Sequence, residues 1–135
     1  MSRMKLIVGF SGAAVLLFAT LTGCSSACTA IGYLYSVEVH ATGEFAALEA
    51  CVDGDCVSSA DATSANSLMF TVRPDGDGSW TVESFTSTPD RLTLRALDDA
   101  GALLAEDSYD LEWTRTGGSE QCGGPMSTPP VDFAV

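Results

Sequence analysis

Apolar and polar residues alternate near the start of the chain, and this pattern constrains the fold more than any other feature of the sequence. The odd positions hold Ile31, Tyr33, Tyr35, Val37, Val39 and Ala41. The even positions hold Gly32, Leu34, Ser36, Glu38, His40 and Thr42. A period of two residues is typical of a β-strand with one buried and one exposed face. We therefore expect a strand over residues 31–42 whose odd-numbered side chains enter a core.

Shorter stretches of the same kind follow, and no stretch after Cys24 keeps a helical period. Further strands are expected over residues 46–52, from 68 to an end at Pro74, from Trp80 onward, and over 92–96, 103–114 and 131–135. The alanines of residues 46–52 also suit a helix. Asp-Gly, Gly-Ser and Ser-Thr-Pro groups, which form turns, separate several of them. We interpret residues 57–67 and 116–130 as loops. About seven to eight short strands in residues 30–135 indicate an all-β fold, namely an immunoglobulin-like β-sandwich that follows a helical signal peptide.

The region before this domain has the pattern of a secretory leader. Arg3 and Lys5 form a short positive segment, residues 6–21 are almost wholly apolar, and no acidic residue occurs before Glu38. This three-part pattern is typical of a signal peptide. An uncleaved membrane anchor is the alternative, but the apolar run is shorter than the roughly 20 residues that a spanning helix needs. Cleavage is therefore favoured.

The leader ends in Leu21-Thr22-Gly23-Cys24, an aliphatic residue, two small residues and a cysteine. This motif resembles the lipobox of bacterial lipoproteins. The resemblance implies that Cys24 receives a diacylglyceryl anchor, with palmitate among its acyl chains, and that the leader is cut in front of it. Two acyl chains hold a protein stably on a membrane. We therefore expect a lipoprotein on the extracytoplasmic face of the cell membrane, with a signal peptide at 1–23, a lipidated tether at 24–29 and the domain at 30–135.

The expected tether is very short, because only three residues lie between Cys24 and Cys28. At about 3.3–3.6 Å per extended residue, Cys28 can stand no more than about 15 Å from the anchor. The domain should therefore lie close to its membrane, and a partner is expected at the same depth.

Acidic side chains dominate the chain, which has 18 acidic and 6 basic residues and a formal net charge of -12. Removal of the leader takes away two basic residues and no acidic one, so the charge of the remaining chain becomes -14. Nucleic acid is not an expected partner, because binding it needs clustered cations. The charge also argues against a protein that lies flat on anionic lipid.

Five cysteines are present, and Cys24 is assigned to the lipid. The other four form an even set in an exported chain, which indicates two disulfides. Three pairings are open. The short spacing favours Cys51 with Cys56, and this choice leaves Cys28 with Cys122, a pair that joins the two ends of the domain. A metal site is the alternative, but Cys-x4-Cys lacks the paired Cys-x2-Cys arrangement, and no cofactor is expected.

Two acidic turns are candidates for calcium binding. Asp53 and Asp55 flank Gly54, and Asp75 and Asp77 alternate with glycines in Asp75-Gly76-Asp77-Gly78. Calcium binds several oxygens on a tight turn, but Thr86 stands where an EF-hand has its last glutamate. Asp-Gly is also an ordinary hairpin turn. The ligand set is incomplete, so we predict no metal site and retain these four residues as calcium candidates.

No catalytic residue is predicted. His40 is the only histidine, it falls on the polar face of the first strand, and no Gly-x-Ser-x-Gly motif accompanies it. A Ser-His-Asp system would have to use this histidine. Paired carboxylates of a glycoside hydrolase could come from Glu106, Asp107, Asp110 and Glu112. On a strand such residues more often form a solvated face, and no cleft is indicated.

A glycine-rich segment surrounds Cys122 and forms a possible binding loop: Gly117, Gly118, Ser119, Glu120, Gln121, Gly123 and Gly124. Glycines permit close backbone approach, and loops on rigid sandwiches commonly bind. Alternatively, the glycines only route the chain around a disulfide. The segment from Trp113 to Gly118, together with Cys122-Gly123-Gly124-Pro125, resembles the ending of small uncharacterised actinobacterial lipoproteins. Those proteins bring no known activity.

These patterns favour a non-enzymatic, membrane-anchored module that binds a protein or a glycan of the cell envelope. One alternative is a structural or accessory envelope protein that binds calcium through its acidic turns. Another is an enzyme of an unfamiliar kind, which would need a cleft lined by titratable groups with perturbed pKa values.

Overall fold

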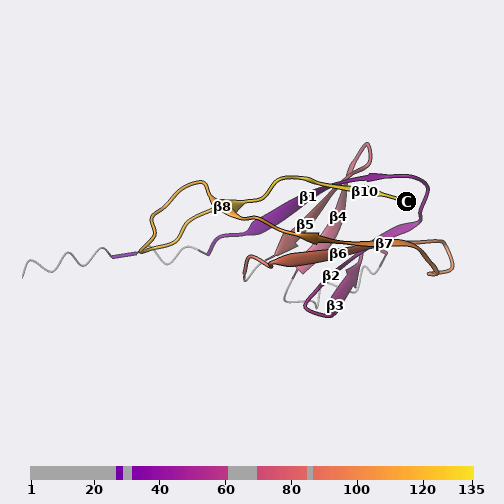
Figure 1. Cartoon of the computed structure of the whole chain (residues 1–135), viewed down its shortest axis with the longest axis horizontal. Coiled ribbons are helices and arrows are strands. Elements are labelled where there is room, and N and C mark those ends of the chain that lie inside the picture. Colours follow the sequence, from indigo (N-terminus) through magenta and orange to yellow (C-terminus); the bar gives the residue numbers. More distant parts are fainter. Residues whose placement is uncertain (1–26, 29–31, 61–69, 85–86) are drawn as a thin grey trace, which may run out of the picture.

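The computed structural model describes residues 27–28, 32–60, 70–84 and 87–135, and these residues form strands and no helix (Figure 1). The leader, Cys24 and most of the tether lie outside the described residues. The strands are β1 (Tyr35–Thr42), β2 (Ala47–Val52), β3 (Asp55–Ser58), β4 (Phe70–Gly76), β5 (Ser79–Ser84), β6 (Arg91–Leu97), β7 (Leu103–Asp110), β8 (Thr114–Arg115), β9 (Met126–Ser127) and β10 (Val131–Ala134).

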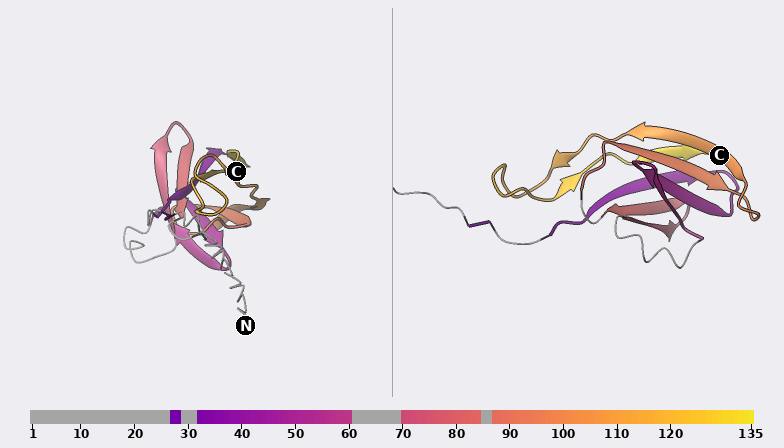
Figure 2. Two further views of the ribbon diagram at one scale, coloured as in Figure 1. Left: turned by 90° about the vertical axis from the view of Figure 1, so that its left-hand side faces the viewer. Right: turned by 90° about the horizontal axis from the view of Figure 1, so that it is seen from below.

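Eight of these strands form two four-stranded sheets, with the orders β10-β1-β5-β4 and β3-β2-β6-β7. Strands β8 and β9 pair separately and project from one end of the molecule (Figures 1 and 2). All pairings are antiparallel except that of β1 with β10, which is parallel. The fold is therefore all-β, and its two larger sheets are those of a β-sandwich.

The core consists of inward-facing side chains from both sheets. The largest fully buried side chains are Phe133, Leu48, Leu92, Leu94 and Val39. No polar or charged residue among those described is buried. Each large apolar side chain that leaves water stabilises the fold by roughly 1.5–3 kcal/mol, so these few residues supply much of the hydrophobic driving force.

The alternating stretch forms β1 from Tyr35 onward, with the predicted face buried; the expected start was too early, because residues 32–34 lie outside the strand. Val37, Val39 and Ala41 are buried, whereas Ser36, Glu38 and Thr42 are exposed. Ile31 lies outside the described residues. The last predicted strand is also present as β10, which packs beside β1 with Val39 opposite Val131. The sequence pattern carried no information about this parallel pairing, because periodicity reports which face is buried and not which strand is adjacent.

Two of the three Asp-Gly pairs, Asp53-Gly54 and Asp77-Gly78, form the two-residue turns of β-hairpins. Asp53 and Gly54 have φ values of 53° and 90°, and Asp77 and Gly78 have values of 52° and 79°. Positive φ at both central residues defines a type I′ turn, whose twist matches the flanking strands. The first of these turns produces β3, which includes part of the stretch that we interpreted as a loop. That interpretation was wrong for Val57 and Ser58, since β3 has too few residues to show a period.

Two other expected boundaries were wrong. Strand β4 continues past Pro74 to Gly76, which is possible because β4 is an edge strand and Pro74 has no N–H to leave unpaired. The expected strand over residues 103–114 ends at Asp110. Its partner β6 begins at Arg91, opposite Asp110, so pairing stops there and the amide of Leu111 donates to the carbonyl of Asp90 (2.8 Å).

The segment interpreted as a loop over residues 116–130 is also more ordered than we expected. Thr114 and Arg115 pair with Ser127 and Met126, and a further bridge joins Ser119 to Gly123. We call residues 113–130 the arm. It is a hairpin that stands out from the sandwich, at the end opposite the C-terminus (Figures 1 and 2).

Candidate functional site

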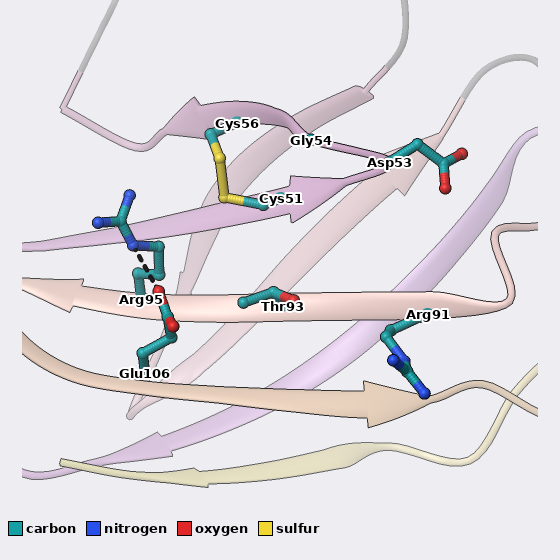
Figure 3. Close-up of a pocket in the computed structure, with 8 residues that line it drawn as sticks. All are labelled: Cys51, Asp53, Gly54, Cys56, Arg91, Thr93, Arg95 and Glu106. Atoms are coloured by element: carbon teal, nitrogen blue, oxygen red, sulfur yellow. Dashed lines mark ion pairs between the residues drawn. A yellow bond between two sulfur atoms is a disulfide. The ribbon is translucent and has the colours of Figure 1, made fainter.

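A hollow of about 410 Å³ opens on the outer face of the second sheet (Figure 3). Its lining residues come from β2, the β2–β3 turn, β3, β6 and β7: Cys51, Asp53, Gly54, Cys56, Arg91, Thr93, Arg95 and Glu106. The alternation of β6 explains the site, because Leu92, Leu94 and Ala96 fill the core and the residues between them must face outward. We call this hollow the sheet pocket.

Cross-strand register decides which side chains meet in the sheet pocket. Arg95 lies between Glu49 on β2 and Glu106 on β7. Its Nη1 hydrogen-bonds Glu49 Oε1, and its Nε lies 2.9 Å from Glu106 Oε2 in an ion pair. The angle at Nε does not satisfy a hydrogen bond, so this buried N–H is held by charge attraction alone. One guanidinium thus joins three strands.

The other cation of the pocket is paired as well. Arg91 donates from Nε and places Nη2 against the same oxygen of Asp110, both at 2.8 Å. Between the two arginines, Thr93 and Ser108 share a hydrogen bond of 2.7 Å. Because carboxylates engage both guanidinium groups, the pocket is suited to a neutral polar ligand rather than to an anion.

Both predicted disulfide pairs are present in the structure. Cys51 and Cys56 lie directly opposite each other on β2 and β3, with their Cα atoms 4.0 Å apart. Cys28 is bonded to Cys122 across 94 residues of sequence. Among the described residues, the only group of three ligand-type side chains close enough to share a metal ion is Glu49, Cys51 and Cys56. With the disulfide formed, its two sulfur atoms offer no thiolate to a metal.

The calcium candidates are divided between the two sheets. Asp53 and Asp55 belong to the β2–β3 hairpin, and Asp75 and Asp77 belong to the β4–β5 hairpin. The carboxylate of Asp75 accepts a hydrogen bond from the Thr81 hydroxyl and lies 3.4 Å from the Arg73 guanidinium. Hairpin geometry by itself accounts for aspartate and glycine at these positions.

His40 lies on the exposed face of the first sheet, between two carboxylates. Its Nε2 is 2.9 Å from Glu38 Oε1, and its Nδ1 is 3.3 Å from Asp132 Oδ1. Register also places Ser79 beside it on β5, so serine, histidine and aspartate occupy neighbouring strands. This row is not a nucleophile system, because the nitrogen that would have to accept the serine proton is engaged by Glu38.

The arm holds the glycine-rich segment that the sequence singled out. A Cβ on Gly118 would lie 2.0 Å from the Gly123 carbonyl oxygen, and one on Gly124 would lie 2.1 Å from that of Gly117. The two sides of the hairpin therefore approach too closely for any side chain at these positions. The amide of Thr116 donates to Pro125 O (2.8 Å), and that of Ser119 donates to Gly123 O (3.0 Å).

A second surface lies at the opposite end of the sandwich. We call residues 43–46, 98–104 and 135 the distal end. It contains three of the four exposed large apolar residues of the described chain, Leu103, Leu104 and Val135. A hollow of about 250 Å³ there is lined by Phe45 and Leu104 and by three carboxylates, those of Glu44, Asp98 and Asp99. Exposed apolar residues rimmed by charge are typical of interaction surfaces.

Sequence reasoning missed both surfaces. The sheet pocket could have been found, since the period of β6 already placed Arg91, Thr93 and Arg95 on the face opposite its core residues. The distal end could not, because Phe45 and Leu104, which line one hollow there, are far apart in the sequence and come together only through the fold.

The comparisons with known proteins yield no relative: no protein-family model, no curated protein and no solved structure matches the chain. None of the residues that the structure describes forms a helix with the length and apolarity that crossing a membrane requires.

We predict that the pKa of His40 lies above its usual value of 6.5, chiefly because Glu38 hydrogen-bonds the protonated ring and Asp132 adds to the effect. The contribution of His40 to stability is therefore present in full below pH 6.5 and is lost as pH rises through the folded pKa. NMR titration of this single histidine measures the shift. Glu38→Gln should lower the pKa more than Asp132→Asn does, and equal values in all three proteins would contradict the geometry.

Gly124→Ala should open the arm, because its methyl group would strike the backbone of Gly117. An overpacked site of this kind costs roughly 1–3 kcal/mol. Hydrogen exchange at the amides of Thr116 and Ser119 should become faster, while exchange in β6 stays unchanged. Gly32→Ala is the matched control, since nothing lies within 4 Å of its added Cβ. Unchanged protection at both arm amides in Gly124→Ala would show that the arm tolerates a side chain there.

Proposed function

We propose that this chain is a lipid-anchored, extracytoplasmic binding module. It is held on a membrane through Cys24 and presents an immunoglobulin-like sandwich to a protein or glycan of the cell envelope. The observation that carries this proposal is the disulfide between Cys28 and Cys122. It ties the residue four positions after the lipobox cysteine directly to the folded domain, and disulfides persist mainly in compartments outside the cytosol.

The strand order supports the immunoglobulin-like assignment. In an immunoglobulin domain, strands A, B, E and D form one sheet and C, F and G form the other. If β1 is taken as strand B, then β2, β4, β5, β6 and β7 correspond in chain order to C, D, E, F and G, with the neighbours that the fold requires. Strand β3 extends the second sheet beside C, and β10 occupies the edge that strand A would take.

A binding role is supported by where the polar and apolar surface features lie. The sheet pocket is a rigid hollow whose arginines are already neutralised, and the distal end combines exposed leucines with carboxylates. Neither brings a nucleophile and a general base together. Of the two, the distal end offers the larger apolar contribution to binding a macromolecule, and we assign the partner to it.

Cys24→Ser should abolish incorporation of a labelled fatty acid and leave an uncut precursor or a released protein. The physical reason is that only the cysteine sulfur can form the thioether that carries the diacylglyceryl group. Metabolic labelling with an alkyne fatty acid, followed by membrane fractionation, provides the measurement. Cys51→Ser with Cys56→Ser is the control that removes two cysteines and keeps the label. Label retained in Cys24→Ser would refute the anchor.

A photo-reactive amino acid in place of Asp99 tests the binding surface in cells. Asp99 is exposed at the distal end, so a partner seated on Leu104 and Phe45 should be captured as one reproducible adduct, identified by mass spectrometry. The same amino acid in place of Glu83, on the outer face of β5, is the control. Capture only at Glu83 would move the binding surface to the first sheet, and capture at neither would argue against a macromolecular partner.

A further inference from the structure

Charge is distributed unevenly between the arm and the rest of the domain. Residues 32–112 contain sixteen acidic and three basic side chains, a formal charge of -13. The arm contains one of each, Arg115 and Glu120, and is neutral. An anionic membrane surface therefore repels the sandwich far more strongly than the arm, whose tip carries Glu120 as its one charged side chain.

The arm is fixed to the sandwich at its base. The indole N–H of Trp113 donates to the carbonyl of Pro89 (2.8 Å), and its ring packs edge-to-face on Tyr35 of β1, with the centroids 6.1 Å apart. Above this base, the backbone hydrogen bonds of Thr116 and Ser119 continue toward the tip. The arm should therefore move with the sandwich as one body.

The arm is long enough to hold the acidic sandwich at a distance where most of its repulsion from a membrane is screened. From Trp113 to Ser119 the chain advances six residues, which at about 3.3 Å per residue is about 20 Å. The Debye length at physiological ionic strength is about 8 Å. A sandwich held at the far end of the arm is thus more than two Debye lengths from a surface at the tip, where most of the repulsion is screened.

The Cys28–Cys122 disulfide holds the tip of the arm close to the lipid anchor. Cys28 can stand no more than about 15 Å from Cys24, and Cys122 is bonded to it. Without the disulfide, the chain from Cys24 to the start of β1 at Tyr35 could span about 36–40 Å, which would let the domain tumble and approach the membrane with any face.

We propose that the arm is the part of the domain that faces the membrane, and we call it the foot in this role. Its tip, residues 117–124, rests on the phospholipid headgroups, while the acidic sandwich stands away from them with the distal end outward. This inference depends on the proposed lipid anchor at Cys24. It gives the glycine-rich segment a lipid surface as its partner, and it separates that segment from the surface assigned to the envelope partner.

The test compares two photo-reactive variants of the full-length chain in cells that carry labelled phospholipid. One replaces Gln121 at the tip of the arm, and the other replaces Asp99 at the distal end; both residues are exposed. Lipid cross-linking at position 121 should exceed that at position 99 by about tenfold or more, which corresponds to an orientation preference of about 1.4 kcal/mol. A probe at Glu120 gives an independent reading of the tip if the Gln121 variant fails to form the Cys28–Cys122 disulfide.

Fatty-acid labelling of the same samples separates the two proposals. A labelled protein that cross-links lipid equally at positions 121 and 99, more at 99, or at neither would overturn the foot and leave the anchor standing. An unlabelled protein would overturn the anchor, and the foot with it.

The role of the disulfide is tested with matched double variants. Cys28→Ser with Cys122→Ser lengthens the tether, so the ratio of cross-linking between positions 121 and 99 should fall towards one. Cys51→Ser with Cys56→Ser removes the other disulfide without changing the tether and should keep the ratio. An unchanged ratio in the first pair would show that the disulfide does not orient the molecule.

Discussion

Strand β1 is paired on both sides, with β5 and with β10, and its odd-numbered side chains are buried between the sheets. A shift of register by one residue would expose Val37, Val39 and Ala41 and bury Glu38 and His40, so the register of this strand is strongly determined. The register of β1 in turn sets the positions of β5 and β10, which pair with it. The contact of His40 with Asp132, the packing of Tyr35 on Trp113 and the position of the arm all follow from it.

The acidic residues occupy positions where the fold can use them without burying charge. Asp53 and Asp77 sit in type I′ turns, and Glu49, Glu106 and Asp110 neutralise the two arginines on the outer face of β6. The exposed Arg91–Asp110 pair contributes little, about 0–1 kcal/mol, whereas Arg95 and Glu49 are partly buried; the ion pairs of both arginines help to fix which strands meet. The remaining carboxylates leave the sandwich strongly negative.

The Cys28–Cys122 disulfide and the uneven charge would together orient the molecule on a membrane. If Cys24 carries lipid, the arm is a part of the described chain that is tied closely to the anchor through Cys122 and carries no net charge. The distal end, with its exposed leucines, then points into the envelope. A module built in this way needs no long linker, because the rigid arm provides the spacing that a linker would otherwise supply.

The sequence by itself determined the class of fold, the buried face of β1 and β6, the two Asp-Gly turns and the favoured pairing of the cysteines. These features depend on local periodicity, local backbone preference or spacing, all of which can be read from a single chain. The tertiary structure decided the parallel pairing of β10 with β1, the end of β7 at Asp110, the arm and the meeting of Arg95 with Glu49 and Glu106. Each of these depends on contacts between residues distant in sequence, and alternation, which repeats every two residues, cannot distinguish one neighbouring strand from another.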